Sequence, residues 1–195
     1  MNHPLRNLNV PIGLAARNRR DSFLLVSLRQ TFWMIAFMLL SAVSLRAASV
    51  DALVFSVSGT VDFAGPGSSS YAPLKKGQTL SIGSTVRTGD DGIAVLRTTT
   101  GSAIQLGNSS TMKINKLAFT QSGGAVTERT AVLELQTGVV SALIDPSTPK
   151  ITDFQVQTPE GAAAARGTFY AVLVYHGKTY VGVKEGKVAV KAADQ

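Results

Sequence analysis

The sequence predicts an all-β protein made of many short strands, and three observations support this. After residue 48, Gly and other turn residues recur every six to twelve positions, with β-branched residues between them. No window of a dozen residues in that region shows the apolar period near 3.6 of an amphipathic helix. Gly77, Gly83 and Gly89 recur at six-residue spacing, as tight corners require. We therefore expect glycine-cornered strands forming a β-roll or solenoid-like fold, a twisted sandwich or a small barrel.

The first part of this region predicts strands separated by loops. Residues 53–63 alternate and are interrupted by Gly59, which favours one strand or a bent pair. Residues 65–70 are rich in Gly, Pro and Ser and predict an exposed loop. Further strands are expected at 93–98, 103–106 and 112–117, with turns at 99–102 and 107–110 and a hairpin tip or loose loop at 120–130.

The second part predicts a hairpin, a break and a final group of strands. Thr137-Gly138 is expected to close a hairpin, and Pro146 and Pro149 break the sheet because proline cannot donate to a strand ladder. Gly161 and Gly167 bracket an alanine run too closely for a stable helix, so that run predicts strand or bulge. Glu185-Gly186 predicts a two-residue hairpin. The strands expected here lie at 131–135, 139–144, 154–157, 168–175, 179–183 and 187–191.

The N-terminal region predicts an export signal. A basic region that ends at Arg29 precedes an uncharged apolar run of 14 residues, 32–45. A bilayer-spanning helix needs roughly 20 apolar residues, so this run favours a secretory signal peptide over residues 1–47. Cleavage is expected after Ser44 or Ala47, and a retained N-terminal membrane anchor is the alternative. One all-β domain is expected over 48–195, located in the periplasm or secreted.

The charge distribution argues against a nucleic-acid partner. The formal net charge is +7, but six of the 19 basic residues precede residue 48. Beyond that point 13 basic residues face 11 acidic ones, so the basicity belongs to the leader. A membrane contact is expected only through an uncleaved leader. The absence of Cys excludes disulfides and thiolate metal sites.

No constellation of catalytic or metal-binding residues is evident. His176 is the only His after residue 48, and one turn His supplies neither a metal site nor a base for a serine nucleophile. Asp90-Asp91-Gly92 is more typical of a plain turn than of a calcium site. An envelope polysaccharide hydrolase would need paired carboxylates at a groove, but the acidic residues are scattered over turns. We expect no enzyme and no cofactor.

Five segments, in order over about 110 residues, resemble the FecR domain. They are the Gly77…Gly83…Thr88-Gly89 stretch, the Gly101 turn at 99–104, the Gly138 segment at 133–140, the Thr158-Pro159 segment at 154–159, and Arg166-Gly167-Thr168-Phe169. With Glu185-Gly186 they form the family signature, expected to be structural or to contact a partner. The resemblance implies an extracytoplasmic, non-enzymatic module. In the regulators of this family, it follows a membrane span and relays receptor occupancy to a sigma-binding segment.

Only about 31 residues precede the apolar run in this sequence, which is too few for the sigma-binding segment of those regulators.

Several residues have two possible roles. Arg166 is the one charged residue of 161–169 and is expected to pair with a carboxylate or strand-end carbonyls; anion binding is the alternative. The tyrosines at 170, 175 and 180 are expected in the core and rim, with a sugar platform as the alternative. The expected function is an exported binding module for a protein or another envelope component; the alternatives are a membrane-anchored signal-transduction component and the hydrolase.

Overall fold

A computed structural model describes residues 48–49, 51–98 and 101–193 of the chain. The predicted leader over 1–47 and residues 99–100 of a predicted turn lie outside these ranges. The described part contains fifteen strands and no helix, so the predicted all-β class is confirmed. None of its segments is a helix that could span a bilayer.

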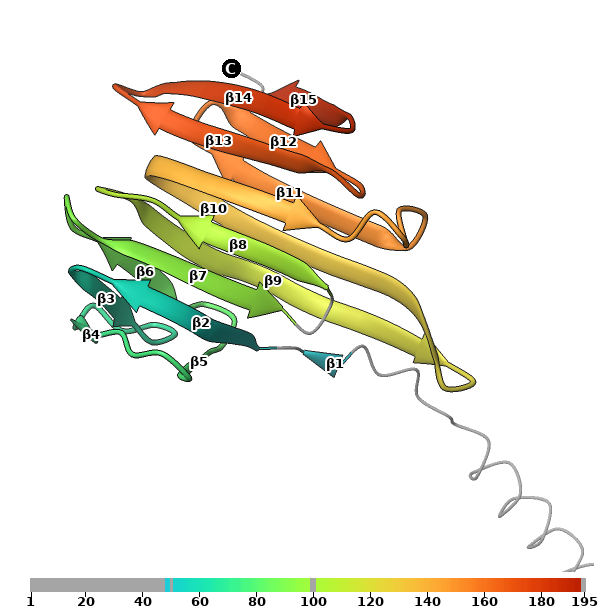
Figure 1. Cartoon of the computed structure of the whole chain (residues 1–195), viewed down its shortest axis with the longest axis horizontal. Helices are drawn as coiled ribbons and strands as arrows, with labels where there is room; N and C mark the ends of the chain where they lie inside the picture. The colour runs from blue at the N-terminus through green and yellow to red at the C-terminus, as the bar shows by residue number, and fades with distance from the viewer. Residues whose placement is uncertain (1–47, 50, 99–100, 194–195) are drawn as a thin grey trace, which may run out of the picture. The chain divides into compact units, whose positions relative to one another are not determined.

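The strands form two layers, called sheet A and sheet B below (Figure 1). Sheet A runs in the order β4 (Ala72–Pro73), β3 (Val61–Ala64), β6 (Thr85–Thr88), β9 (Thr111–Ser122), β10 (Ala125–Ile144), β11 (Thr152–Thr158), β12 (Gly161–Ala165) and β15 (Val188–Ala192), with β1 (Ala48–Ser49) also beside β9. Sheet B runs in the order β5 (Thr79–Leu80), β2 (Ala52–Ser58), β7 (Ile93–Thr98), β8 (Ser102–Leu106), β10, β13 (Phe169–Tyr175) and β14 (Lys178–Glu185). Neighbouring strands are antiparallel except for β10 and β11.

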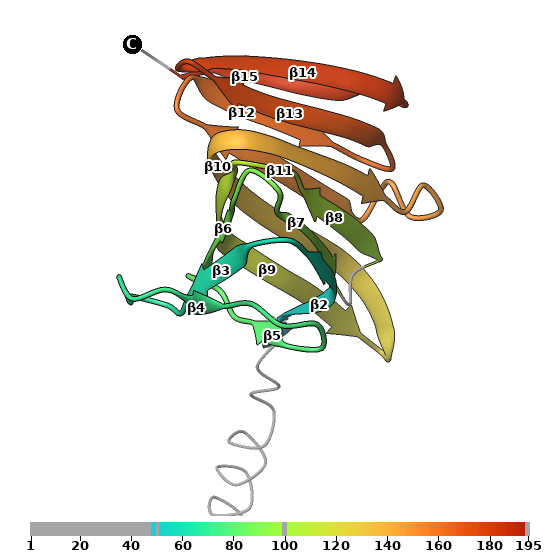
Figure 2. The same cartoon turned by 60° about the vertical axis from the view of Figure 1, so that its left-hand side comes forward.

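The hydrophobic core lies between the two sheets. Alternate residues of each strand point inward, as the period of two requires. Sheet A contributes Met112, Leu133 and Phe154, and sheet B contributes Leu96 and Tyr170, all of them buried. The rings of Phe154 and Tyr170 meet edge to face across the layers, with centroids 6.3 Å apart. The turned view in Figure 2 shows the same two layers. Of the architectures left open by the sequence, the chain forms a sandwich whose two sheets share a strand.

The shared strand is β10, and here the predicted hairpin at Thr137-Gly138 is wrong. Its first half pairs with β9 and β11 in sheet A, and its second half pairs with β8 and β13 in sheet B, so the halves do not pair with each other. A register irregularity lies between Leu135 and Thr137, and Gly138 has φ +84°. A Cβ on Gly138 would lie 2.5 Å from Ser110 Cα, so the crossing needs glycine.

Glycines mark the described crossings of the chain between the layers, except the return from β10 to β11 over residues 145–151, which contains Pro146 and Pro149 instead. Of the seven glycines in the predicted signature, six lie at crossings and Gly101 lies in the β7–β8 hairpin. Glu185-Gly186 is one of these crossings, so the predicted hairpin there is also wrong: β14 pairs with β13 and β15 pairs with β12. The crossing glycines are Gly59, Gly77, Gly83, Gly89, Gly92, Gly107, Gly138, Gly167 and Gly186.

The other local predictions fare better. Residues 162–165 lie in strand β12, as predicted. The stretch 120–130 is a hairpin tip at Gly123-Gly124 with paired strands up to the turn, so the loose-loop alternative is wrong. Residues 53–63 form the bent pair β2 and β3, and residues 65–70 form a loop exposed over most of its length. His176-Gly177 closes the β13–β14 hairpin with positive φ at both residues, as a two-residue turn between twisted strands requires.

Candidate functional site

The last signature residues gather at one corner of the sandwich, around the buried side chain of Thr168. Its hydroxyl lies 3.1 Å from the carbonyl oxygen of Lys187, and the amide of Ile144 donates to the carbonyl of Thr168 at 3.0 Å. A Cβ on Gly186 would lie 2.8 Å from Thr168 Oγ1, so glycine is needed for the close approach. These contacts around Thr168 therefore join the crossings β12–β13 and β14–β15 to the end of β10. This corner is a structural clamp.

The remaining signature residues lie away from that corner. Gly89 and Gly138 lie near a second hydroxyl clamp, in which Thr88 Oγ1 donates to the carbonyl of Gly107 at 2.6 Å. Thr158 and Pro159 begin the turn from β11 to β12. Gly77 and Gly83 flank β5, and Gly101 faces Asp145. The signature thus marks the corners of the fold and does not converge on one site.

Arg166 is a correction to the sequence-based expectation. Its side chain is exposed and, within the described ranges, makes neither an ion pair nor a hydrogen bond. The adjacent corner is held instead by Thr168 and by Gly167, whose missing Cβ leaves room for Pro146 Cα at 2.9 Å from the Cβ position.

The outer face of sheet B is unusually apolar. One cross-strand row joins Leu53, Arg97, Ala103, Leu143 and Phe169 in direct register. Leu143 exposes 52% of its surface, although it lies in the middle of this sheet. We call the following exposed or half-exposed side chains of the outer face of sheet B the apolar face: Leu53, Phe55, Ala103, Leu143, Phe169, Leu173, Tyr175 and Tyr180. The neighbouring row on the same face includes the polar residues Ser56, Gln105 and Ser141, and it lies between the Leu143 row and Leu173. Exposed apolar side chains gathered on one face mark interaction sites.

Two cations lie on the apolar face and are held over aromatic rings. The guanidinium carbon of Arg97 lies 4.1 Å from the centroid of Phe55, and Lys184 Nζ lies 5.0 Å from that of Phe169. Such contacts favour these positions of the two long side chains. A hollow lined by Arg97, Leu143, Asp145 and neighbouring residues opens at this face. The arrangement places two positive charges beside exposed apolar side chains.

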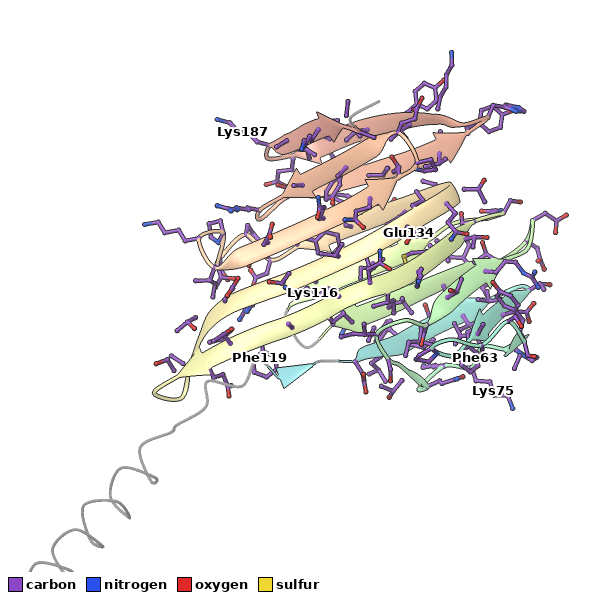
Figure 3. All side chains as sticks on the ribbon, turned by 180° about the vertical axis from the view of Figure 1, so that it is seen from behind. Phe63, Lys75, Lys116, Phe119, Glu134 and Lys187 are labelled. Carbon is purple, nitrogen blue, oxygen red and sulfur yellow. The ribbon has the colours of Figure 1, made fainter. Side chains whose placement is uncertain are left out.

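The outer face of sheet A is polar by contrast. Asn115 Nδ2 donates to Glu134 Oε2 and to Gln157 Oε1, both at 3.1 Å, in a row across β9, β10 and β11. Figure 3 views this side of the molecule and labels Lys116 and Glu134 on it. The two faces therefore differ in chemistry although they belong to one sandwich.

Among the described residues, two carboxyl groups have shifted pKa values, and both shifts are downward. A hydrogen bond from the Thr60 amide to Asp91 lowers the pKa of that carboxyl, and hydrogen bonds from Ser147 lower the pKa of Asp145. A general acid needs the opposite shift. His176 packs its ring against Tyr175, with centroids 4.1 Å apart. In the part of the chain that the structure describes, no three His, Cys, Asp or Glu residues are grouped as a metal site would need.

The sequence held one signal for the apolar face that periodicity alone did not reveal. Residues 169–175 read Phe-Tyr-Ala-Val-Leu-Val-Tyr and are apolar or aromatic on both faces of the strand. In an antiparallel sheet with one solvated face, outward positions are normally polar. Two of the tyrosines expected in the core or rim lie in this strand, on opposite faces of it. Tyr170 is buried, and Tyr175 is exposed on the apolar face.

The fold and its corners define a two-layered β module with glycine crossings, and a comparison with protein families gives its family. The model of a family described as FecR protein matches residues 84–189, more than half of the chain. The chain therefore belongs to the FecR family, as the resemblance implied. Comparisons with curated proteins and with solved structures gave no match. The family is generally a component of signal-transduction regulators and is not known for enzymatic activity.

Proposed function

We propose that this chain is an exported, non-catalytic binding module of the periplasm or cell envelope, and that it binds a protein through the apolar face. The observation that carries the proposal is the contrast between the two outer faces. Leu143 and Tyr180 expose 52% and 53% of their surface on sheet B, whereas Asn115, Glu134 and Gln157 occupy sheet A. When a partner covers exposed apolar surface of this kind, the free energy of the system falls, which favours binding.

The apolar face has the composition of a protein interface. Tyr, Phe and Arg are enriched at the centres of such interfaces, where they supply most of the binding energy. Here Phe55 and Arg97 are already stacked, so little side-chain entropy is lost on binding. The partner is expected to present apolar side chains to Leu143 and Leu173, and carboxylates to Arg97 and Lys184.

A second candidate is a membrane-anchored signal-transduction component whose leader is retained. The family membership favours it, because FecR proteins are generally parts of such regulators. In that case the apolar face would contact a receptor outside the cytoplasm. The hydrolase alternative has less support, because the carboxyls of Asp91 and Asp145 have lowered pKa values.

A photo-crosslinking amino acid at Leu143 tests the binding face in cells that express the full chain. We expect cross-linking to one discrete envelope protein, and its loss when Leu173→Asp is added. Lys116, on the outer face of sheet A, is the matched control position. Equal cross-linking from both positions, or none from Leu143, would contradict the proposal.

Cell fractionation with N-terminal sequencing tests the location. A chain that begins near residue 45 or 48 in the periplasmic fraction supports export with cleavage. An intact Met1 in the membrane fraction supports the anchored signalling component. A chain confined to the cytoplasm would contradict both.

A further inference from the structure

One end of the sandwich is open in both layers. Strand β14 pairs only with β13 and ends sheet B, while β15 pairs only with β12 and ends sheet A, as far as the described residues extend. Figures 1 and 2 both show these two strands at the same end of the molecule. We call this end, with Val181, Val183, Val188 and Val190, the open end.

The open end leaves inward-facing valines uncovered. Val190 lies opposite buried Ala163, and Val183 lies opposite buried Tyr170, so both face the space between the sheets. Nevertheless Val190 exposes 64% of its surface and Val183 exposes 46%. Val181 and Val190 line one hollow between the layers, so they lie across from each other. The core is therefore incomplete at this end.

In both strands, alternate backbone groups point away from the neighbouring strand and toward the open side. The amide of Thr179 donates to the Glu160 carboxylate at 2.5 Å and so points away from β13. Because these directions alternate in an antiparallel strand, Val181 and Val183 also direct their backbone groups outward. The amide of Ala193 donates to the carbonyl of Glu160, so the backbone groups of Val188 and Val190 point away from β12 by the same alternation.

We propose that a second copy of this chain covers the open end, related by a twofold axis perpendicular to the two sheets. One such axis pairs β14 with β14 and β15 with β15 in antiparallel fashion, so both sheets continue across the interface. The axis passes between the two copies of Val181 in sheet B and between the two copies of Val190 in sheet A. Val181 and Val190 line the same hollow, so one axis can pass through both pairs.

This register is self-complementary in shape. With Val181 at the centre, Tyr180 lies directly opposite Gly182 of the second copy on the outer face. Tyr180 exposes 53% of its surface, and Gly182 has no side chain and open space above its Cα. An aromatic ring that covers a cross-strand glycine is a known stabilising pair. On the inner face Thr179 lies opposite Val183, and the valines of both copies close the core.

The register is also complementary in charge. The irregularity opposite Phe169 and Tyr170 places both Lys184 and Glu185 at one position of β14. In the proposed pairing Lys178 of one copy meets this position of the other. Lys184 is held over Phe169, which leaves Glu185 to face the incoming Lys178. The twofold axis makes this pair twice, and opposite charges across strands favour the register.

The inference does not rest on the proposed function, because it follows from the unpaired edges of β14 and β15, although Tyr180 of the apolar face takes part in the proposed pairing. An axis perpendicular to the sheets leaves both apolar faces on the same side of the dimer. Two copies would therefore offer a partner one continuous surface.

Cross-linking of single-cysteine variants tests the proposal, because the chain has no Cys of its own. A short bismaleimide should join two full-length Val190→Cys chains into a dimer at micromolar concentration. Leu143→Cys on the apolar face is the matched control and should give at least fivefold less dimer. A Val190→Cys chain that cross-links no better than the control, or that joins a different protein in cells instead, would overturn the proposal.

Sedimentation velocity gives the second measurement. We expect a concentration-dependent dimer for the full chain in mild detergent, and a monomer for Val183→Lys, which places a charge in the interface. Near-ultraviolet circular dichroism identifies a variant that fails to fold, and Tyr180→Ala, on the exposed outer face, then replaces it. A monomer for the unmodified chain at all concentrations up to several hundred micromolar would refute the second copy.

Discussion

The hydroxyl of Thr168 and the carbonyl of Lys187 lie 3.1 Å apart and tie together two crossings that are 19 residues apart in the sequence. Thr168 is buried at 2% exposure, so its hydroxyl has no water to replace that contact. Replacing Thr168 with valine keeps the shape of the side chain but removes its hydroxyl, so the Lys187 carbonyl loses its hydrogen-bond donor.

We expect Thr168→Val to lower the free energy of unfolding by about 1–2 kcal/mol, the cost of a buried hydrogen bond whose partner stays behind. Chemical denaturation with urea measures this change. Thr127→Val is the control, because its hydroxyl bonds the Thr120 carbonyl at an exposed site. A Thr168→Val protein as stable as the Thr127→Val protein would show that the clamp is dispensable.

The crossing at Gly138 should tolerate no side chain. We expect Gly138→Ala to lower the free energy of unfolding by roughly 2–4 kcal/mol, because a positive φ is strained for alanine and the Cβ overlaps Ser110. Thermal unfolding measures the loss. Gly123→Ala also has positive φ but meets no atom within 4 Å, so it separates backbone strain from overlap. Equal losses in the two variants would assign the whole effect to strain.

Tyr170 carries a buried hydroxyl with no hydrogen-bond partner among the described residues. We expect Tyr170→Phe to raise the free energy of unfolding by about 1 kcal/mol at pH 7, since an unsatisfied buried hydroxyl is costly. Tyr175→Phe, whose hydroxyl is on an exposed residue, is the matched control. A loss of stability in Tyr170→Phe would mean that the hydroxyl has a partner in solution.

The same residue should make stability fall at high pH. Burial raises the pKa of Tyr170 above its ordinary value of about 10. Above that value the unfolded chain loses this proton while the folded chain keeps it, so stability declines as pH rises beyond about 10. Urea unfolding between pH 8 and 11 should show this decline, and it should be smaller in Tyr170→Phe. Parallel curves for the two proteins would contradict the assignment.

Glu160 should restrain the association of two copies. Its carboxylate accepts a hydrogen bond from the Thr179 amide, which would otherwise be able to donate to the second copy. We expect Glu160→Ala to strengthen dimerisation about fivefold, since the competing hydrogen bond contributes roughly 1 kcal/mol. Sedimentation equilibrium measures the dissociation constant, and Glu134→Ala on sheet A is the control. Weaker association in Glu160→Ala would show that Glu160 supports the interface.

Most strands could be predicted from sequence, because alternation and turn residues act locally. Residues 93–98 form β7 as expected, and the glycines of the signature do mark corners. The two wrong hairpins share a cause. A glycine with positive φ occurs both in hairpin turns and where the chain crosses from one sheet to the other. Which of the two forms depends on pairing with strands that are distant in the sequence. At Gly138 those partners are β8 and β13 on one side and β9 and β11 on the other.

The apolar face and the open end could not be predicted in the same way. Their residues are ordinary strand residues, and only the sheet order shows that Leu143 faces outward or that Val190 lies at an edge. The expected pairing of Arg166 failed for a related reason. The loop after β10 packs against the adjacent Gly167, whose Cβ position lies 2.9 Å from Pro146 Cα.

Strand β10 has a consequence for how this module can be divided. Since its 20 residues complete both sheets, a cut in the loop that follows it would strip β11 from one layer and β13 from the other at once. Neither fragment would retain a closed interior. Evolution and protein engineering must therefore transfer, fuse or delete this β body as one indivisible piece.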